Sequence, residues 1–240
     1  MRHKTWIRGA IAGFALAAVA HIGARRVGPL PPLGQLLDPW GGAWAAATSA
    51  ELPELQSLAL TNLQDSVRVE YDDRGVPHIF AASAEDAARA MGYVVARDRL
   101  FQMEMRWRAA AGRVSELVGA AALDYDRYIR ELGLAWSADR EFAATDPGSQ
   151  TAAVLAAYSE GVNAWVDGLS RRDIPLEYRL LGARPGRWET VYGLYLLKQM
   201  GWNLTYGMET DLLRLRVAGK VGREAADALL PVNSPIQQPI

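Results

Sequence analysis

The sequence predicts a mainly α-helical chain whose folded part begins with one β-hairpin. Two periodic patterns support this fold class. Apolar residues recur every three to four positions along much of 84–230, which is the spacing of a helix that packs on one face. Apolar and polar residues alternate over 67–71, which is the period of a half-buried strand. A third observation is the absence of cysteine, which excludes disulfides, thiolate metal sites and a cysteine nucleophile.

Composition narrows the classes of function. Half of the 240 residues are apolar, which is enough for one large domain or two small ones. The 26 basic and 27 acidic residues give a formal net charge of −1, and this balance argues against a dedicated nucleic-acid-binding protein. Two of the three histidines lie in the N-terminal segment, so we expect no multi-histidine metal site.

The N-terminal segment 1–24 carries the pattern of an export signal. Its basic start is followed by 9–24, which contain no Asp, Glu, Lys or Arg. This run is longer than a usual signal-peptide core and shorter than a usual membrane-spanning helix, and Ala18-Val19-Ala20 offers a small-x-small cleavage site. We expect a signal peptide or an uncleaved membrane anchor, since a buried Ala-rich core helix fits the flanks less well. Both main interpretations predict an exported protein, periplasmic or anchored outside the cytoplasm, that meets a membrane only through this segment.

Residues 25–65 are expected to form a strap and a connector rather than a domain, because 27–44 are rich in Pro and Gly. The folded body is expected over 66–240. Its first element is a hairpin, in which the strand 67–71 is followed by a turn at Asp72–Gly75 and the return strand "VPHIFA". Two strands alone make a marginal sheet, so we expect this hairpin to join strands that lie outside this chain.

Helices are expected to fill the remainder of the body. Ser83 is a predicted N-cap, with Asp86 three residues later as in a capping box. Gly92 is expected to divide the first helical stretch, and Pro175 and Pro185 are expected to mark loops. The spacing of apolar residues predicts helices over 84–90, 92–111, a short segment between 112 and 119, 149–169, 191–203 and 209–230.

Common catalytic motifs are absent from the sequence. There is no Walker loop, G-x-G-x-x-G, H-E-x-x-H or G-x-S-x-G. A Ser-His-Asp triad would have to use His78, which follows Pro77 in an apolar strand and is better explained as a hydrogen-bonded structural histidine. Asp72 and Asp73 fit a solvated turn, and Ser149 fits a helix cap.

The arginine-rich stretch 92–117 raises the alternatives of a nucleic-acid, membrane-surface or partner-facing helix. Its acidic residues are interleaved with the arginines, because Asp98 lies next to Arg99 and Glu104 lies four residues before Arg108. Such pairs stabilise a helix face, so we expect a packed scaffold helix. Its apolar face is expected to be seated by Tyr93, Leu100, Met103 and Trp107.

Three longer strings resemble the N-terminal part of the penicillin acylase (penicillin amidase) family. They are "DDRGVPHIFAASAEDAARAMGYVVARDRLFQMEMRWRAAAGRVSELVG", "YSEGVNAWVDGL" and "PLEYRLLGARPGRWETVYGLYLLKQMGW", which occur in the family's order over about 66–231. The combination of G-V-P-H-I, G-Y-V-x-A-x-D-R-L-F-Q-M and G-x-N-A-W is highly specific, whereas 1–65 match less strongly. The resemblance implies an N-terminal nucleophile hydrolase. Its complete fold would be an α+β four-layer αββα sandwich, to which this chain contributes mainly helices and one hairpin.

The resemblance also implies a mechanism that this chain does not complete by itself. Family members are exported precursors that cut themselves into α and β chains, and this chain resembles the leader plus the α chain. The nucleophile is the first serine of the β chain, and its own α-amine acts as the base. No Gly-Ser-Asn junction occurs before the end "PVNSPIQQPI", where Ser234 is expected to be a loop residue. We therefore place no catalytic residue here and expect an α-chain portion or truncated fragment that is inactive alone.

Four residues are carried over from sites of the family's α chain. The string "METDLLRL" aligns with the segment that gives one carboxylate to a structural Ca²⁺ shared with the β chain, which assigns Glu209 to that role. In the preceding helix the family closes the acyl pocket with a Met and an Arg-Phe pair. Met200 takes the place of the Met, whereas Asn203 and Leu204 stand where the Arg and Phe would be. This departure leaves two acyl groups open, the aromatic acetyl group of the penicillin G enzymes and the long chain of the acyl-homoserine lactone acylases.

The resemblance thus predicts the α-chain portion of an exported amidohydrolase that cleaves a linear amide, such as the acyl side chain of a β-lactam or another N-acyl compound. Its expected partners are its own β chain and a small-molecule amide, with no nucleic acid. A non-catalytic, membrane-anchored interaction module is the alternative from another class. The DNA downstream of codon 240 discriminates the two, because an open frame supports the enzyme and a stop codon supports the module or a fragment.

Overall fold

The structure is a computed structural model that describes residues 2–25, 32, 34, 38, 42–49, 56–170, 173–205 and 207–231. Ser234 and most of the predicted strap over 27–44 lie outside the described residues. The chain forms two compact units, 1–196 and 197–240.

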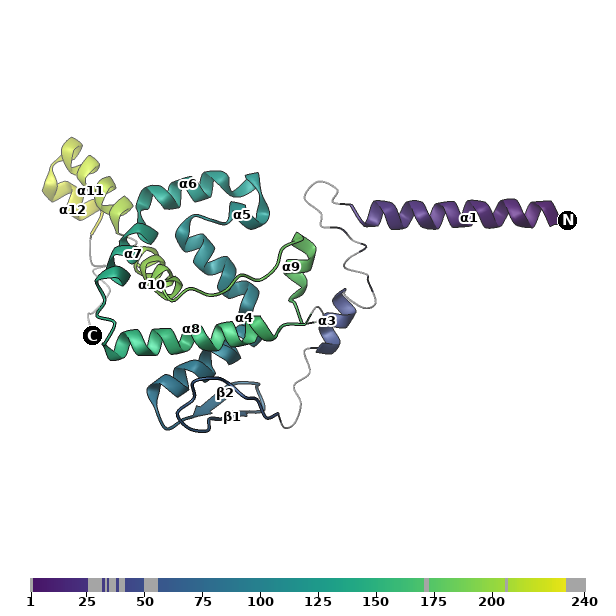
Figure 1. Ribbon diagram of the computed structural model, residues 1–240. Coiled ribbons are helices and arrows are strands. Elements are labelled where there is room, and N and C mark those ends of the chain that lie inside the picture. The colour runs from purple at the N-terminus through teal and green to yellow at the C-terminus, as the bar shows by residue number, and fades with distance from the viewer. Residues whose placement is uncertain are drawn as a thin grey trace. The chain divides into compact units, whose positions relative to one another are not determined.

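The described residues of the first unit begin with helices α1 (Arg2–Gly23) and α3 (Ala43–Ser49) (Figure 1). Apolar side chains of α1 are exposed, with Phe14 at 79% and Val19 at 69%. Within the described ranges, no helix has both the length and the apolar composition that crossing a membrane requires. The export signal over 1–24 stays a prediction.

The hairpin is confirmed as strands β1 (Arg68–Tyr71) and β2 (Pro77–Phe80), which pair antiparallel. Between them the backbone N–H of Asp72 donates to the C=O of Val76 at 3.1 Å, and Gly75 supplies the positive φ of 74° that the turn requires. The described residues form only this two-stranded sheet, so Pro77, which has no N–H to donate, lies on an edge strand. The additional strands that would complete the sheet stay a prediction.

The long helix α4 (Ala84–Ala111) follows the hairpin and contains the arginine-rich stretch. Ser83 caps it as predicted, because its Oγ accepts the N–H of Asp86 at 3.1 Å. The helix ends at Gly112 in the left-handed conformation (φ 64°). The predicted break at Gly92 is wrong, since the helix continues through that residue, and the local departure from helical geometry lies instead at Arg99 (φ −140°, ψ 18°).

Gly92 is needed for contact with the second long helix, α8 (Gln150–Gly168), rather than for a break. A Cβ atom at Gly92 would lie 2.1 Å from the backbone O of Tyr158, and a Cβ atom at Gly161 would lie 1.9 Å from the backbone O of Arg89. The two glycines therefore let α4 and α8 pack backbone against backbone (Figure 1). Helix α8 also confirms the prediction over 149–169.

Shorter helices complete the first unit. The short helix predicted between 112 and 119 is present, and the helix predicted over 191–203 is also confirmed. Pro175 and Pro185 lie in loops, as predicted, and one short helix forms between them. The bounds are α5 (Ser115–Val118), the 3₁₀ turn η1 (Ala120–Ala122), α6 (Leu123–Leu132), α7 (Leu134–Ala144), α9 (Leu176–Leu181) and α10 (Tyr192–Asn203).

The core of this unit gathers around α4. Leu100, Met103 and Trp107 are 5–8% exposed, which confirms them as seating residues. Tyr93 meets Trp165 of α8 edge to face, with ring centroids 5.5 Å apart. Each fully buried side chain of this size stabilises the fold by roughly 1.5–3 kcal/mol. The core also contains Val162, Tyr178, Trp188, Val191, Tyr192 and Tyr195.

The second unit contains the end of α10 and two further helices, α11 (Met208–Val221) and α12 (Arg223–Leu229). The helical region predicted over 209–230 is confirmed, and Gly222 (φ 85°, ψ 159°) divides it because it ends α11 and starts α12. An ion pair between Arg214 and Asp227 at 2.6 Å joins the two helices.

Candidate functional site

Two of the three predicted acyl-pocket residues, Met200 and Leu204, lie on one exposed stripe at the end of α10. The N–H of Leu204 donates to the C=O of Met200 at 3.0 Å, so these two residues are one helical turn apart. Their exposures are 62% for Met200 and 76% for Leu204, and Leu197 extends the same face at 57%. We call Leu197, Met200 and Leu204 the α10 stripe. Asn203 is also exposed and ends the helix.

Such a stripe presents apolar surface to water that a substrate or another polypeptide would cover favourably. Its three side chains have the period of one helix face, so they present a continuous apolar strip rather than scattered exposed residues. The structure thus brings Met200 and Leu204 together.

Glu209, the predicted calcium ligand, is exposed in the first turn of α11. Asp211 lies in the same turn, but within the described residues no group of three or more His, Cys, Asp or Glu side chains could hold a metal ion. Calcium takes six to eight oxygen ligands. The described residues could therefore contribute one part of such a site, and the remaining oxygens would have to come from elsewhere.

The arginines of α4 are used in a polar network inside the first unit. Arg108 donates from Nε and Nη2 to one carboxylate oxygen of Glu104, at 3.0 and 2.7 Å, which confirms the predicted i,i+4 pair. Tyr178 of α9 donates its hydroxyl to the other oxygen of Glu104. Burial and the adjacent carboxylate raise the pKa of Tyr178 far above its ordinary value. Arg108 also lies over the ring of Trp107, 4.6 Å from its centroid.

A second buried carboxylate was not identified from the sequence. Asp86 has no exposed surface, and its oxygens accept the backbone N–H groups of Gln64 and Asp65 at 3.1–3.2 Å. Arg89 donates to Asp86 at 3.1 Å and to Glu160 of α8 at 2.8 Å. Burial alone would raise the pKa of Asp86, but these donors outweigh it and hold the pKa below its ordinary value. Asp86 thereby fixes the connector to the start of α4.

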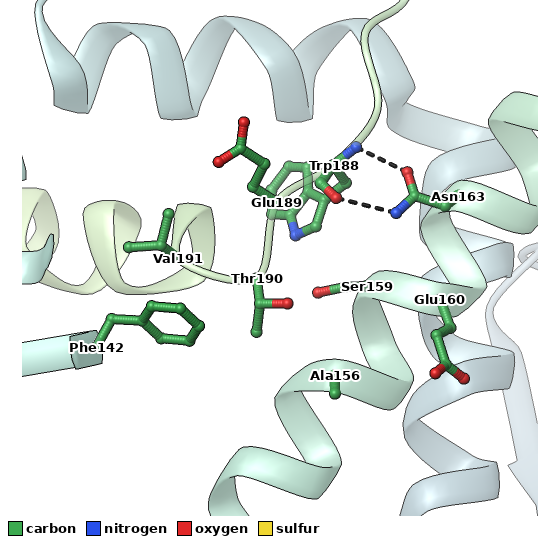
Figure 2. A pocket seen from close by; sticks show the side chains of 9 residues that line it. All are labelled: Phe142, Ala156, Ser159, Glu160, Asn163, Trp188, Glu189, Thr190 and Val191. Atoms are coloured by element: carbon green, nitrogen blue, oxygen red, sulfur yellow. Dashed lines mark hydrogen bonds between the residues drawn. The ribbon is translucent and has the colours of Figure 1, made fainter. Parts of the chain in front are cut away.

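A pocket of about 430 Å³ lies between α8 and the segment that leads into α10 (Figure 2). Asn163 fixes that segment, because its side chain donates to the C=O of Trp188 at 2.9 Å and accepts the Trp188 N–H at 2.8 Å. In Figure 2 the hydroxyls of Ser159 and Thr190 face each other across the hollow. The remaining lining residues are Phe142, Ala156, Glu160, Glu189 and Val191.

Ser159 and Asn163 of the pocket bind neighbouring backbone groups and hold them in place. They do not form the hydrogen bonds of an activated nucleophile. Ser159 donates its hydroxyl to the backbone O of Leu155 at 2.8 Å. The ionisable side chains that line the pocket are Glu160, which accepts from Arg89, and Glu189, which accepts from Tyr192, so neither is paired with the Ser159 hydroxyl. The structural importance of Asn163 could have been found from the G-x-N-A-W string, in which a polar residue interrupts a buried helical face.

His78 differs from its predicted environment. Its side chain is 53% exposed, because it alternates onto the outer face of β2, and its Nε2 lies 3.5 Å from Oδ2 of Asp72. Asp72 also accepts the N–H groups of Arg74 and Val76 at 3.0 and 2.8 Å, which confirms it as a turn residue. His78 is thus a surface residue of the hairpin and does not lie in an apolar environment.

Comparison with solved structures defines the class of this helical scaffold. The chain is similar to a thermostable penicillin G acylase from Alcaligenes faecalis, with a TM-score of 0.59 and 27% identity over 73% of this chain and 96% of that chain. The class is the N-terminal nucleophile hydrolases, which agrees with the fold predicted from the sequence. A family model described as penicillin amidase matches residues 66–236. The chain therefore belongs to the penicillin amidase family.

Curated relatives carry two kinds of name, penicillin acylase and acyl-homoserine lactone acylase. The chain is 42% identical to penicillin acylase 2 proenzyme of Pseudomonas sp. (strain SE83) over 65% of its length, and this match covers 20% of the relative. It is 30% identical to the acyl-homoserine lactone acylase QuiP of Pseudomonas syringae pv. syringae over 84% of its length, covering 26% of the relative. The chain thus spans a fifth to a quarter of the length of these relatives.

Proposed function

We propose that this chain is the α-chain portion of an exported amidohydrolase, and that the remainder of its precursor supplies the β chain. One observation carries this proposal. The chain matches 96% of one chain of a solved penicillin G acylase, yet it matches only 20% of a relative that is named as a proenzyme. Both facts follow if the relatives are long precursors from which a helical chain of about this size is cut.

The reaction that follows is amide hydrolysis through an acyl-enzyme. The first serine of the β chain attacks the amide carbonyl, its α-amine takes the hydroxyl proton and delivers it to the leaving amine, and water then releases the acid. An α-amine has a pKa of about 7.7–8.0, so it is available as a base near neutral pH. Donors of the β chain stabilise the oxyanion. No residue of the present chain is assigned to these steps.

The present chain contributes an apolar wall and a rigid support. The α10 stripe offers the acyl group a helical face of Met200 and Leu204, and burial of an apolar acyl chain against it is favourable at about 25 cal/mol per Å². Asn203 adds one neutral polar group at the end of this face. The Asp86 and Asn163 contacts hold the connector and the segment before α10 in place.

Two acyl groups are candidates, and a specific observation favours each. The higher identity, 42%, is to a penicillin acylase, which favours the side chain of a β-lactam. The longer match, 84% of the chain, is to an acyl-homoserine lactone acylase, and an exposed aliphatic Leu204 suits a long acyl chain. Hydrolysis of phenylacetyl and decanoyl p-nitroanilides by the assembled enzyme distinguishes the two acyl groups. A more than tenfold preference for one substrate identifies the acyl group that the enzyme accepts.

Structural calcium is a further part of the proposal, with Glu209 as the one ligand from this chain. Chelation by EDTA should lower the thermal midpoint of the assembled protein, and Glu209→Gln should remove most of that sensitivity. Asp211→Asn is the matched control, because it removes a neighbouring carboxylate of the same turn. Equal EDTA sensitivity in Glu209→Gln and the unmodified protein would contradict the assignment.

Export through 1–24 completes the proposal. The rival function is a non-catalytic module that uses the same scaffold to bind another protein. The reading frame beyond codon 240 separates the two, since an open frame that encodes a Gly-Ser-Asn junction supports the enzyme. Absence of amide hydrolysis from the product of that complete frame would favour the module.

A further inference from the structure

Helix α10 is fixed through the side chains at its beginning. Among the described residues of α10, only Tyr192 and Tyr195 are buried, at 5% and 9% exposed. Leu194 and Leu196 pack partly buried beside them. The positions that follow, Leu197–Asn203, are exposed or half-buried. The direction in which α10 presents its stripe therefore depends on the contacts that its first residues make.

The shortest ring contact of this part of α10 is with Trp107 of α4. The Trp107 ring is 5% exposed and stacks on the ring of Tyr192, with centroids 4.0 Å apart and planes inclined by 11°. Arg108 and Arg113 lie over the Trp107 ring, 4.6 and 4.9 Å from its centroid. Glu116 binds both arginines. Trp107 is thus held in place on α4 and presents a flat surface that fixes the orientation of Tyr192.

Hydrogen bonds and a second aromatic contact complete the attachment. Trp188 meets Tyr192 edge to face, with ring centroids 5.5 Å apart. The hydroxyl of Tyr192 donates to Glu189 at 3.0 Å, and that of Tyr195 donates to Asp139 of α7 at 2.7 Å. Burial, together with the carboxylate that accepts each hydroxyl, raises the pKa of Tyr192 to about 12 and the pKa of Tyr195 well above its ordinary value. Both hydroxyls therefore remain protonated donors at neutral pH.

A small tilt at this end of α10 becomes a large displacement at the stripe. An α-helix rises 1.5 Å per residue, so Met200 lies about 12 Å along the helix from Tyr192. A tilt of about 10° at Tyr192 would therefore move Met200 by roughly 2 Å. A misplacement of about 1 Å is already enough to disturb the productive position of a bound substrate.

We propose that Trp107 is a positioning residue that sets the acyl specificity of the enzyme, because its stack on Tyr192 fixes the direction in which α10 presents Met200. This rests on the proposed function, in which the α10 stripe contacts the acyl group. Trp107 lies in the core and acts through α10 rather than on the substrate. Its loss should therefore weaken the choice between acyl groups without stopping amide hydrolysis.

The test uses the protein expressed from the complete frame, with phenylacetyl and decanoyl p-nitroanilides as substrates. Trp107→Leu should bring the ratio of the two kcat/KM values toward one by at least about fivefold, mainly through KM. Trp107→Phe keeps an aromatic face and should restore most of the preference. Tyr195→Phe removes only the hydroxyl that binds Asp139, so it should shift the ratio in the same direction by a smaller factor. This variant serves as the test if Trp107→Leu does not fold.

Phe101→Leu is the matched control, because Phe101 lies on the same helix but meets Tyr178 of α9, with ring centroids 5.2 Å apart. It should lower the thermal midpoint and leave the ratio unchanged. An unchanged ratio in Trp107→Leu, or in Tyr195→Phe where the first variant does not fold, would show a merely structural role and overturn the proposal. An equal shift in Phe101→Leu, or an unmodified enzyme without any preference, would overturn it as well. Absence of hydrolysis of both substrates by the unmodified product would instead contradict the proposed function.

Discussion

Replacement of Gly92 or Gly161 by alanine should force the two long helices apart. A Cβ atom would lie 2.1 Å from the backbone O of Tyr158 in the first case and 1.9 Å from that of Arg89 in the second. Carbon atoms pack at about 3.5 Å or more from neighbouring heavy atoms, so the helix backbones would have to separate by roughly 1.5 Å. Because the obstacle is backbone, no side-chain rotation relieves it.

The net effect follows from two opposing quantities. Overpacking of this kind costs about 3 kcal/mol at the upper end of its usual range, whereas alanine in a helix interior gains about 1 kcal/mol over glycine. Each substitution should therefore lower the free energy of unfolding by about 2 kcal/mol. Urea unfolding followed by far-ultraviolet circular dichroism should show this loss as a lower midpoint. The slope of the free energy of unfolding against urea concentration should be unchanged.

Gly193→Ala is the matched control for this experiment. Gly193 also lies in a helix of the first unit, but its Cβ atom would meet only the side chain of Leu155 at an ordinary 3.9 Å. This variant should be at least as stable as the unmodified chain. If Gly92→Ala and Gly161→Ala are also at least as stable, the helices do not pack backbone to backbone and the account of the crossing fails.

Two further predictions concern the polar anchors. Asn163→Ala removes both hydrogen bonds to the Trp188 backbone and should destabilise the chain by about 1–3 kcal/mol in urea unfolding. Asn163→Asp keeps an acceptor but loses the donor, so it should also be destabilised. Full stability of both variants would contradict the role of Asn163 as an anchor. The pKa of Asp86 is lowered in the folded state, so the charged form is the one that its bonds to Gln64 and Asp65 stabilise. This contribution to the free energy of unfolding is present above the unfolded pKa of about 3.8, and it disappears as the pH falls through the lower folded pKa. The gap in urea midpoint between the unmodified chain and Asp86→Asn should therefore be full at pH 7 and shrink below about pH 4, and a gap independent of pH would contradict the role of the charge.

Local patterns predicted most of the fold. The strands, the Ser83 and Ser149 caps and the long helices follow from hydrophobic period and capping chemistry, which act within a few residues. Gly92 was misassigned for a physical reason. Its low helix propensity suggests a break, but the close approach of α8, which lies about 70 residues later in the sequence, requires glycine there.

The candidate site could be predicted only in part. The position of Met200 and Leu204 on one helix face follows from their spacing, and the structure places them accordingly. The hydrogen-bond partners of Asp86 and Asn163 could not be predicted, because tertiary packing brings Gln64 and Trp188 to them. The proposed catalytic geometry and the remaining oxygens of the proposed calcium site would be supplied by polypeptide beyond the described residues.

Amide hydrolysis by matched preparations tests the central claim most directly. The 240-residue chain and the product of the complete reading frame are purified in parallel and supplied with phenylacetyl and decanoyl p-nitroanilides. The account predicts that the complete product releases p-nitroaniline from at least one substrate, and that the 240-residue chain releases none above the uncatalysed rate. Hydrolysis by the 240-residue chain alone would contradict the claim that this chain is a scaffold whose nucleophile lies on another polypeptide.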